Sequence, residues 1–241
     1  MLLRLENAAA AMNALQHDQE RVANNLANAN TTGFKRDRFF TEALNERMDA
    51  ENAPRSDRRL RQTYDMSGGA LKQTGNPLDV ALGGDGFFET QPEGGGESHY
   101  TRAGHFVVGK EGTLRTPDGR QVMGEGGAIQ IPVDTGEEIS IASDGTITAG
   151  NRRVGTLKVV SVDNPAQMER QQGASFRAGT ATPEPMEDPS VLQGKVEKSN
   201  VSPVEEMTDM IQTSRQYEAQ QRSLQTTNDV LSRATQDLGQ L

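Results

Sequence analysis

Residues near the start of the 241-residue chain recur with the three-and-four spacing of a helix that buries one narrow face. The positions on this face are Leu5, Ala8, Met12, Leu15, Gln19, Val22, Leu26 and Ala29. Since this spacing holds over four heptads, it predicts one long helix with a narrow seam. Residues 28–33 are rich in Asn and end in Gly, and both residue types tolerate the left-handed backbone that closes a helix.

The end of the chain repeats this spacing. Ser202, Pro203 and Glu205 can cap a helix that continues to Leu238, a length of roughly 54 Å at 1.5 Å per residue. Its predicted seam contains Met207, Met210, Ser214, Tyr217, Gln221, Leu224, Asn228, Leu231, Thr235 and Leu238. Polar residues in such a seam lower stability but fix register and partner choice. We therefore expect the two ends to pair as a coiled coil, and to pair again with copies from neighbouring molecules.

The middle of the chain changes to short alternating runs separated by glycine turns. The turn dipeptides begin at Asp85, Glu111, Asp118 and Asp144. They predict a mainly-β domain of short hairpins over residues 77–179. Polar and proline-containing stretches at 37–76 and 180–199 are expected to be extended connectors. The predicted fold class is thus α + β, with a helical domain formed by residues 1–36 and 200–241 and a β-rich domain inserted into it.

Composition limits the classes of function. Hydrophobic residues make up 33% of the chain and aromatics 4%, so a large isolated core is not expected. The net charge of −9 argues against nucleic-acid binding, and no apolar run is long enough for membrane insertion. Cysteine is absent, which excludes disulfides and thiol chemistry. The first residues lack the basic and apolar regions of a cleaved signal peptide.

Candidate chemistry is sparse. The stretch from Gly83 to Gly86 lacks the lysine and serine or threonine of a phosphate-binding loop, so a β-turn is the better interpretation. The histidines at positions 17, 99 and 105 are not at metal-ligand spacing. We expect no catalytic residue, no metal and no cofactor. A glycan-cleaving enzyme with paired carboxylates stays open as an alternative, although the sequence selects no pair.

Four stretches resemble a known family. Residues 23–36 (ANNLANANTTGFKR) resemble the N-terminal signature of the flagellar axial proteins, the rod and hook family. Residues 75–88, 100–106 and 194–207 agree with further family stretches in the same order. The resemblance implies a helical axial domain, an outer β-domain and helical polymerisation. It also implies a place in the basal body in the periplasmic space, reached through the flagellar type III export apparatus without a cleaved signal.

Within that family, the compact length and residues 209–218 are most like a proximal-rod subunit and next like a distal-rod subunit. The expected partners are neighbouring rod subunits, copies of the chain itself and the export apparatus. The expected assembly interface comprises Asn24, Asn25, Leu26, Asn28, Gly33, Phe34, Met207, Met210, Tyr217, Leu224 and Leu231. The resemblance favours inter-subunit hydrogen bonds from the amides of Asn24, Asn25 and Asn28. An alternative from another class is a secreted binding module on a coiled-coil stalk, which predicts a small closed oligomer.

Overall fold

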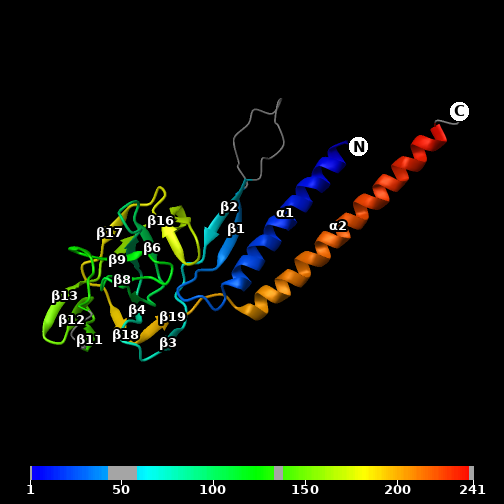
Figure 1. The fold of residues 1–241 in the computed structure, drawn as a ribbon. Helices are drawn as coiled ribbons and strands as arrows, with labels where there is room; N and C mark the ends of the chain where they lie inside the picture. The colour runs from blue at the N-terminus through cyan, green and yellow to red at the C-terminus, as the bar shows by residue number, and fades with distance from the viewer. Residues whose placement is uncertain (1, 43–58, 133–137, 239–241) are drawn as a thin grey trace. The chain divides into compact units, whose positions relative to one another are not determined.

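The computed structural model describes residues 2–42, 59–132 and 138–238, and it combines two helices with many short antiparallel strands over this part of the chain (Figure 1). Helix α1 spans Leu2–Ala27 and helix α2 spans Pro203–Leu238. The mixed helix and sheet composition that the sequence predicts is therefore confirmed. Residues 43–58 of the predicted connector lie outside the described residues.

The chain divides into two compact units. The helical unit comprises Met1–Ala27, Asp37–Gln62 and Ser202–Leu241, and the β unit comprises Asn28–Arg36 and Thr63–Val201. In the helical unit, residues of α1 contact both α2 and strand β1 (Asp37–Glu42). Strand β1 pairs with β2 (Arg59–Tyr64) in a two-stranded sheet.

The largest sheet of the described β unit has ten strands, and its main path runs β15-β16-β6-β5-β9-β8-β7. Strand β10 pairs with β9, and β14 lies between β5 and β17. The strands are β5 (Phe87–Gln91), β6 (His99–Thr101), β7 (Val107–Val108), β8 (Leu114–Arg115), β9 (Gln121–Gly124), β10 (Gly127–Ala128), β14 (Val159–Val162), β15 (Glu169–Arg170), β16 (Ser175–Arg177) and β17 (Pro183–Pro185). A 3-10 turn over Pro165–Gln167 precedes β15.

Three smaller sheets complete the described β unit. Strands β11 (Ile139–Ile141), β12 (Thr146–Ala149) and β13 (Arg152–Thr156) form an antiparallel meander. Gly145 lies at the turn between β11 and β12 with a φ of 82°, which matches the turn predicted at Asp144-Gly145.

The stretch at 180–199 is more than an extended connector. Besides β17, it contains β18 (Val191–Gln193) and β19 (Lys195–Glu197), which pair with β4 (Val80–Leu82) and β3 (Leu71–Gln73) respectively. Val191 and Val196 are buried, so these short strands contribute apolar surface to the β unit. Sequence patterning missed them because three-residue strands are too short to show alternation.

Apolar packing in the β unit is divided between two main clusters. The larger includes Phe88, Phe106 and Leu114, with the Phe88 and Phe106 rings edge-to-face at a centroid distance of 5.3 Å. The second gathers Phe87, Tyr100 and Phe176 with neighbouring apolar residues. With so few aromatic residues, edge-to-face pairs and short aliphatic side chains fill the interior.

Gly33 is held where a side chain cannot fit. Its φ is 68°, and a Cβ atom there would lie 2.3 Å from the backbone nitrogen of Ala103. The Gly33 N–H also donates to the Glu197 carbonyl at 2.8 Å. Gly75 has a similar φ of 75° but open space around its Cβ direction. Both glycines have a left-handed backbone, but only Gly33 is also closely packed. Comparing the same substitution at the two positions therefore distinguishes the cost of backbone strain from the cost of a steric clash.

We predict that Gly33→Ala destabilises the chain more than Gly75→Ala does. A left-handed alanine costs about 1–2 kcal/mol at either position, and the clash with Ala103 should raise the cost at Gly33 above about 3 kcal/mol. Urea unfolding of both variants measures the difference. Equal losses would show that the Ala103 backbone can move aside.

Candidate assembly site

Asn25 joins α1 to β1 through two hydrogen bonds. Its Oδ1 accepts from the Asp37 N–H at 2.8 Å, and its Nδ2 donates to the Asp37 carbonyl at 3.1 Å. The Asn25 side chain is completely buried, whereas Asn24 beside it is exposed. The amide expected to bond between subunits is thus used inside its own chain, where it fixes the start of β1 against α1.

A second polar group joins α1 to α2. It consists of Asp18, Arg21, Glu206 and Thr213, and we call it the Arg21 cluster. Arg21 lies 2.8 Å from Asp18 and 3.8 Å from Glu206, and the Thr213 hydroxyl donates to Asp18 at 3.3 Å. Glu206 is fully buried and Thr213 is 5% exposed. Glu206, Thr213 and most of Arg21 therefore lie between the helices, and Asp18 reaches them from a partly exposed position.

The Arg21 cluster changes the predicted seam of α2. Met210, Tyr217 and Leu224 are half-buried as expected, but Met207, Gln221 and Asn228 are exposed. Ser214 of the same predicted column is half-buried and accepts from Gln19, but the more buried positions lie one residue earlier, at Glu206, Thr213, Gln220 and Thr227. The sequence prediction was wrong for Met207 because it favoured this apolar residue over Glu206, whose carboxylate Arg21 reaches.

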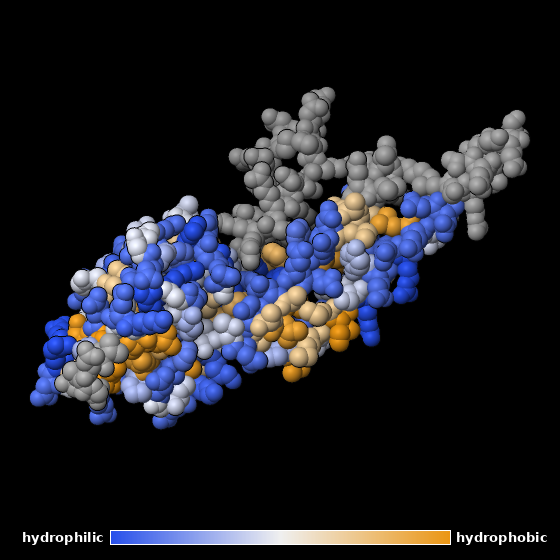
Figure 2. All heavy atoms as spheres, viewed as in Figure 1, coloured by the Kyte–Doolittle hydropathy of each residue, from blue (hydrophilic) through white to orange (hydrophobic). Residues whose placement is uncertain are grey.

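This arrangement leaves apolar side chains on the outside of α2. Val204 is 74% exposed, Met207 50% and Ile211 55%. Spaced three and four residues apart, they lie on one face of the helix, and we call them the α2 stripe. Figure 2 shows hydrophobic atoms gathered over the first turns of α2. Single exposed apolar residues are ordinary, but a continuous row is typical of a contact surface.

The family-like segment around Lys35 enters the β unit through a buried charge pair. The Lys35 ammonium donates to a Glu197 carboxylate oxygen at 2.6 Å and to the Ser67 carbonyl at 2.8 Å. Arg102 lies 3.6 Å from the other Glu197 oxygen, and all three charged side chains are almost fully buried. Burial lowers the pKa of Lys35, while its hydrogen bond to Glu197 acts in the opposite direction. We call these three residues the Lys35 cluster.

Phe34 packs in the same region of the β unit. It is 1% exposed and forms a small apolar cluster with Ala29, Ala174 and Val201. The guanidinium of Arg170 lies 4.1 Å from the centre of its ring, within the range of a cation–π contact. Phe34, expected at an assembly interface, is therefore a core residue of the single chain.

Asn200 ties together the polypeptide segments next to Phe34. Its side-chain oxygen accepts from the Arg36 N–H at 2.8 Å, and its Nδ2 donates to the Asp65 carbonyl at 2.8 Å. The sequence resemblance covered Asn200 without assigning it a role. Its partners come from distant parts of the chain, so local pattern gives no signal for them.

The remaining expected interface residues divide by exposure. Leu26, Asn28, Met210, Tyr217 and Leu224 are half-buried. Gly33 is buried, and Leu231 lies within α2 beyond the described side chains. Of the expected set, Asn24 and Met207 are the described residues with exposed side chains. Of these two, Met207 keeps a large apolar side chain in contact with water.

The described residues also bear on the chemistry considered from sequence. Across 2–42, 59–132 and 138–238, no three histidine, aspartate or glutamate side chains gather as metal ligands, and neither helix has a stretch apolar enough to cross a bilayer. His105 lies 2.6 Å from Asp79, and Asn76 donates to the same carboxylate oxygen at 3.2 Å. The contact between His105 and Asp79 links the segment that leads into β7 with the residue just before β4.

Comparison with known proteins identifies the family. Residues 5–35 match the family described as flagella basal body rod protein, 81–149 the flagellar hook protein FlgE/F/G D1 domain, and 192–237 the flagellar basal body rod FlgEFG protein C-terminal region. The flagellar basal-body rod protein FlgF of Caulobacter vibrioides is 32% identical, with 94% of each chain covered. The chain belongs to the flagellar basal-body rod protein family.

Other relatives agree with this assignment. FlgF of Salmonella typhimurium is 36% identical, with 95% of each chain covered. The basal-body rod protein FlgG of Agrobacterium fabrum is 33% identical, covering 96% of this chain and 97% of its own. The expectation of a structural rod subunit, most like FlgF and next like FlgG, is confirmed. Membership of this structural family sets aside both the enzyme and the stalked binding module.

We predict that Asn25→Ala weakens the helical unit of this rod subunit and that Asn13→Ala, at an exposed position of α1, does not. A buried group left without its partner costs about 1–3 kcal/mol, and Asn25→Ala removes the acceptor of the Asp37 N–H, while the Asp37 carbonyl keeps a long contact from Arg21 at 3.4 Å. Hydrogen exchange at the Asp37 amide should accelerate in the first variant alone. A protected Asp37 amide in Asn25→Ala would contradict this assignment.

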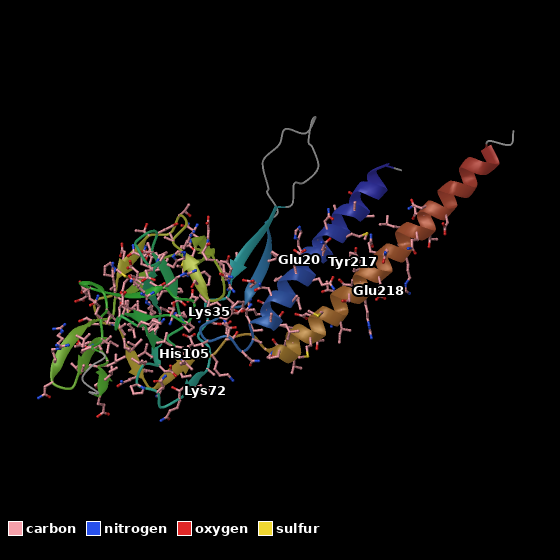
Figure 3. All side chains as sticks on the ribbon, viewed as in Figure 1. Glu20, Lys35, Lys72, His105, Tyr217 and Glu218 are labelled. Atoms are coloured by element: carbon pink, nitrogen blue, oxygen red, sulfur yellow. The ribbon has the colours of Figure 1, made fainter. Side chains whose placement is uncertain are left out.

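Lys35→Met should destabilise the β unit by about 3–5 kcal/mol, because it leaves the Glu197 carboxylate buried beside Arg102 without its main partner. Lys72, on β3, is exposed, so Lys72→Met is the matched control and should change stability by less than about 0.5 kcal/mol. Both lysines are labelled in Figure 3. Urea unfolding of the two variants checks the difference, and equal effects would remove the special role of the Lys35 cluster.

Proposed function

We propose that the chain is a proximal-rod subunit whose α1 and α2 form a coiled-coil axial domain that polymerises with neighbouring rod subunits. Its likeness to FlgF relatives supports the proximal position. FlgG relatives have similar identity and coverage, so a distal-rod position is the second candidate. A drive shaft of this kind needs long elements with many repeated lateral contacts.

The domain organisation proposed with this function keeps its sequence boundaries. In this proposal residues 1–36 and 200–241 supply the axial domain and residues 77–179 the outer β-domain, although residues 28–36, 63–76 and 180–201 group with the β unit in the single chain. We further propose export through the flagellar type III apparatus without a cleaved signal, and assembly of the rod in the periplasmic space. The absence of cysteine suits a chain that must pass through an export channel unfolded.

The α2 stripe is the observation that carries polymerisation. Three large apolar side chains stay in contact with water on the first turns of a 36-residue helix. Covering them with a neighbouring subunit would remove that apolar surface from water, at about 25 cal/mol per Å². Met207 was expected in the interface from the sequence, and its exposure leaves it available for that role.

A charge placed in the stripe should block assembly and leave the isolated chain folded. Met207→Glu would put a carboxylate into an apolar contact, which costs at least about 2 kcal/mol per interface, or some thirtyfold in association. We expect loss of swimming in cells that carry only this variant, with few completed rods in purified basal bodies.

The control is Gln212→Glu. Gln212 is exposed beside the stripe but lies roughly 100° round the helix from Ile211. This variant adds the same charge and should swim normally. Normal swimming by Met207→Glu would remove the stripe from the interface, and failure of both variants would show that negative charge anywhere on this end of α2 is harmful.

A further inference from the structure

Helix α2 has two possible inner faces. In the structure the inner face of its first turns is formed by the buried Glu206 and Thr213 with the half-buried Met210 and Tyr217, and Ser214 is half-buried at its edge. The alternative face suggested by the heptads contains Met207, Met210, Ser214 and Tyr217. Because successive residues are about 100° apart, the two faces differ by a roll of α2 of about 50°. Both faces contain Met210 and Tyr217. They differ in the second column, which is Glu206 and Thr213 in the observed face and Met207 and Ser214 in the alternative face.

Apolar burial by itself favours the face that is not used. Rolling α2 would take Met207, now 50% exposed, out of water and return the fully buried Glu206 carboxylate to it. Both changes would lower the free energy in the absence of other interactions. Burial is favourable for a large apolar side chain and unfavourable for a carboxylate. A specific interaction must therefore hold α2 in the observed orientation.

The Arg21 cluster supplies that interaction. Arg21 faces two carboxylates, with Asp18 at 2.8 Å on its own helix and Glu206 at 3.8 Å on α2. Thr213, two turns further along α2, donates to Asp18 at 3.3 Å, and Gln19 donates to Ser214 at 3.3 Å. The contacts of Glu206 and Thr213 hold their column inward, whereas the Gln19–Ser214 bond lies at the edge shared with the alternative face. Buried polar groups at seam positions are known to fix register in this way at some cost in stability.

We propose that Arg21 and Glu206 are specificity-determining positions for assembly: they fix the rotation of α2, so that Met207 stays beside Val204 and Ile211 and faces a neighbouring rod subunit instead of α1. This inference rests on the proposed polymerisation and adds the residues that control it. The pair lowers the stability of the isolated chain relative to an apolar seam and preserves the surface that a neighbour uses.

Single cysteines can report the rotation, because the natural chain has none. Gln221 lies in the exposed column and Gln220 in the half-buried one, and neither belongs to the Arg21 cluster. In the full-length chain, maleimide should label Gln221→Cys at least tenfold faster than Gln220→Cys. Adding Arg21→Met and Glu206→Met together should reverse the order of the two rates as α2 rolls.

The matched control replaces an exposed pair of the same chemistry. Arg222 and Glu218 lie 3.2 Å apart on α2, with side chains 77% and 61% exposed. Arg222→Met combined with Glu218→Met should leave both labelling rates and swimming unchanged. Arg21→Met combined with Glu206→Met should abolish swimming although the chain unfolds at the same or a higher temperature. Glu206→Gln keeps the shape of the side chain and should narrow the ratio of labelling rates, which provides a second test if the double variant does not fold.

Several outcomes would overturn the inference. One is labelling that keeps the native order in both the double variant and Glu206→Gln. Another is equal labelling of positions 220 and 221 in the natural background, since α2 would then have no fixed inner face. Normal swimming by a double variant whose labelling order has reversed would also overturn it. The labelling uses the isolated chain, so it is independent of Met207→Glu, which tests polymerisation itself.

Discussion

The contact between Arg21 and Glu206 determines what each face of α2 does. A glutamate with no exposed surface requires a cation within reach, and Arg21, itself held by Asp18, is the described cation that meets this need. Once Glu206 is inward, helical geometry places Met207 and Ile211 outward. The same contact thus sets an internal packing face and an external apolar row, and neither can change without the other.

A second buried charge pair has a different role in the β unit. The Lys35 cluster connects the segment after α1 with strand β19, although Lys35 and Glu197 are 162 residues apart. Phe34 and Asn200 add an apolar contact and backbone hydrogen bonds at neighbouring positions. The sequence signature around Phe34 and Lys35 is therefore explained largely by folding of the single chain.

The sequence predicts the regular elements well and the polar contacts poorly. Heptad spacing and capping residues locate α2 from Pro203, and glycine turns locate several hairpins. The inner face of α2 could not be predicted, because apolar periodicity treats every glutamate as an exposed residue. Glu206 is buried only because Arg21, distant in the sequence, lies close to it in the fold. The same reason hides Asn25, whose hydrogen bonds lie within the chain, and strands as short as β18 and β19, whose pairing depends on segments more than a hundred residues away.

The contacts between α1 and α2 join residues that are far apart in the sequence, so they form late in folding. Residues 18–25 are made well before residues 206–214, and Gln19 and Ser214, which bond across the two helices, are 195 residues apart. Contacts of such long sequence separation form late, after the intervening chain has closed a large loop. A chain that emerges from its N-terminus first would complete the β unit while α1 still lacks α2. The outward apolar row on α2 is therefore made after the β unit, and it is displayed in its final orientation only once α2 has packed against α1.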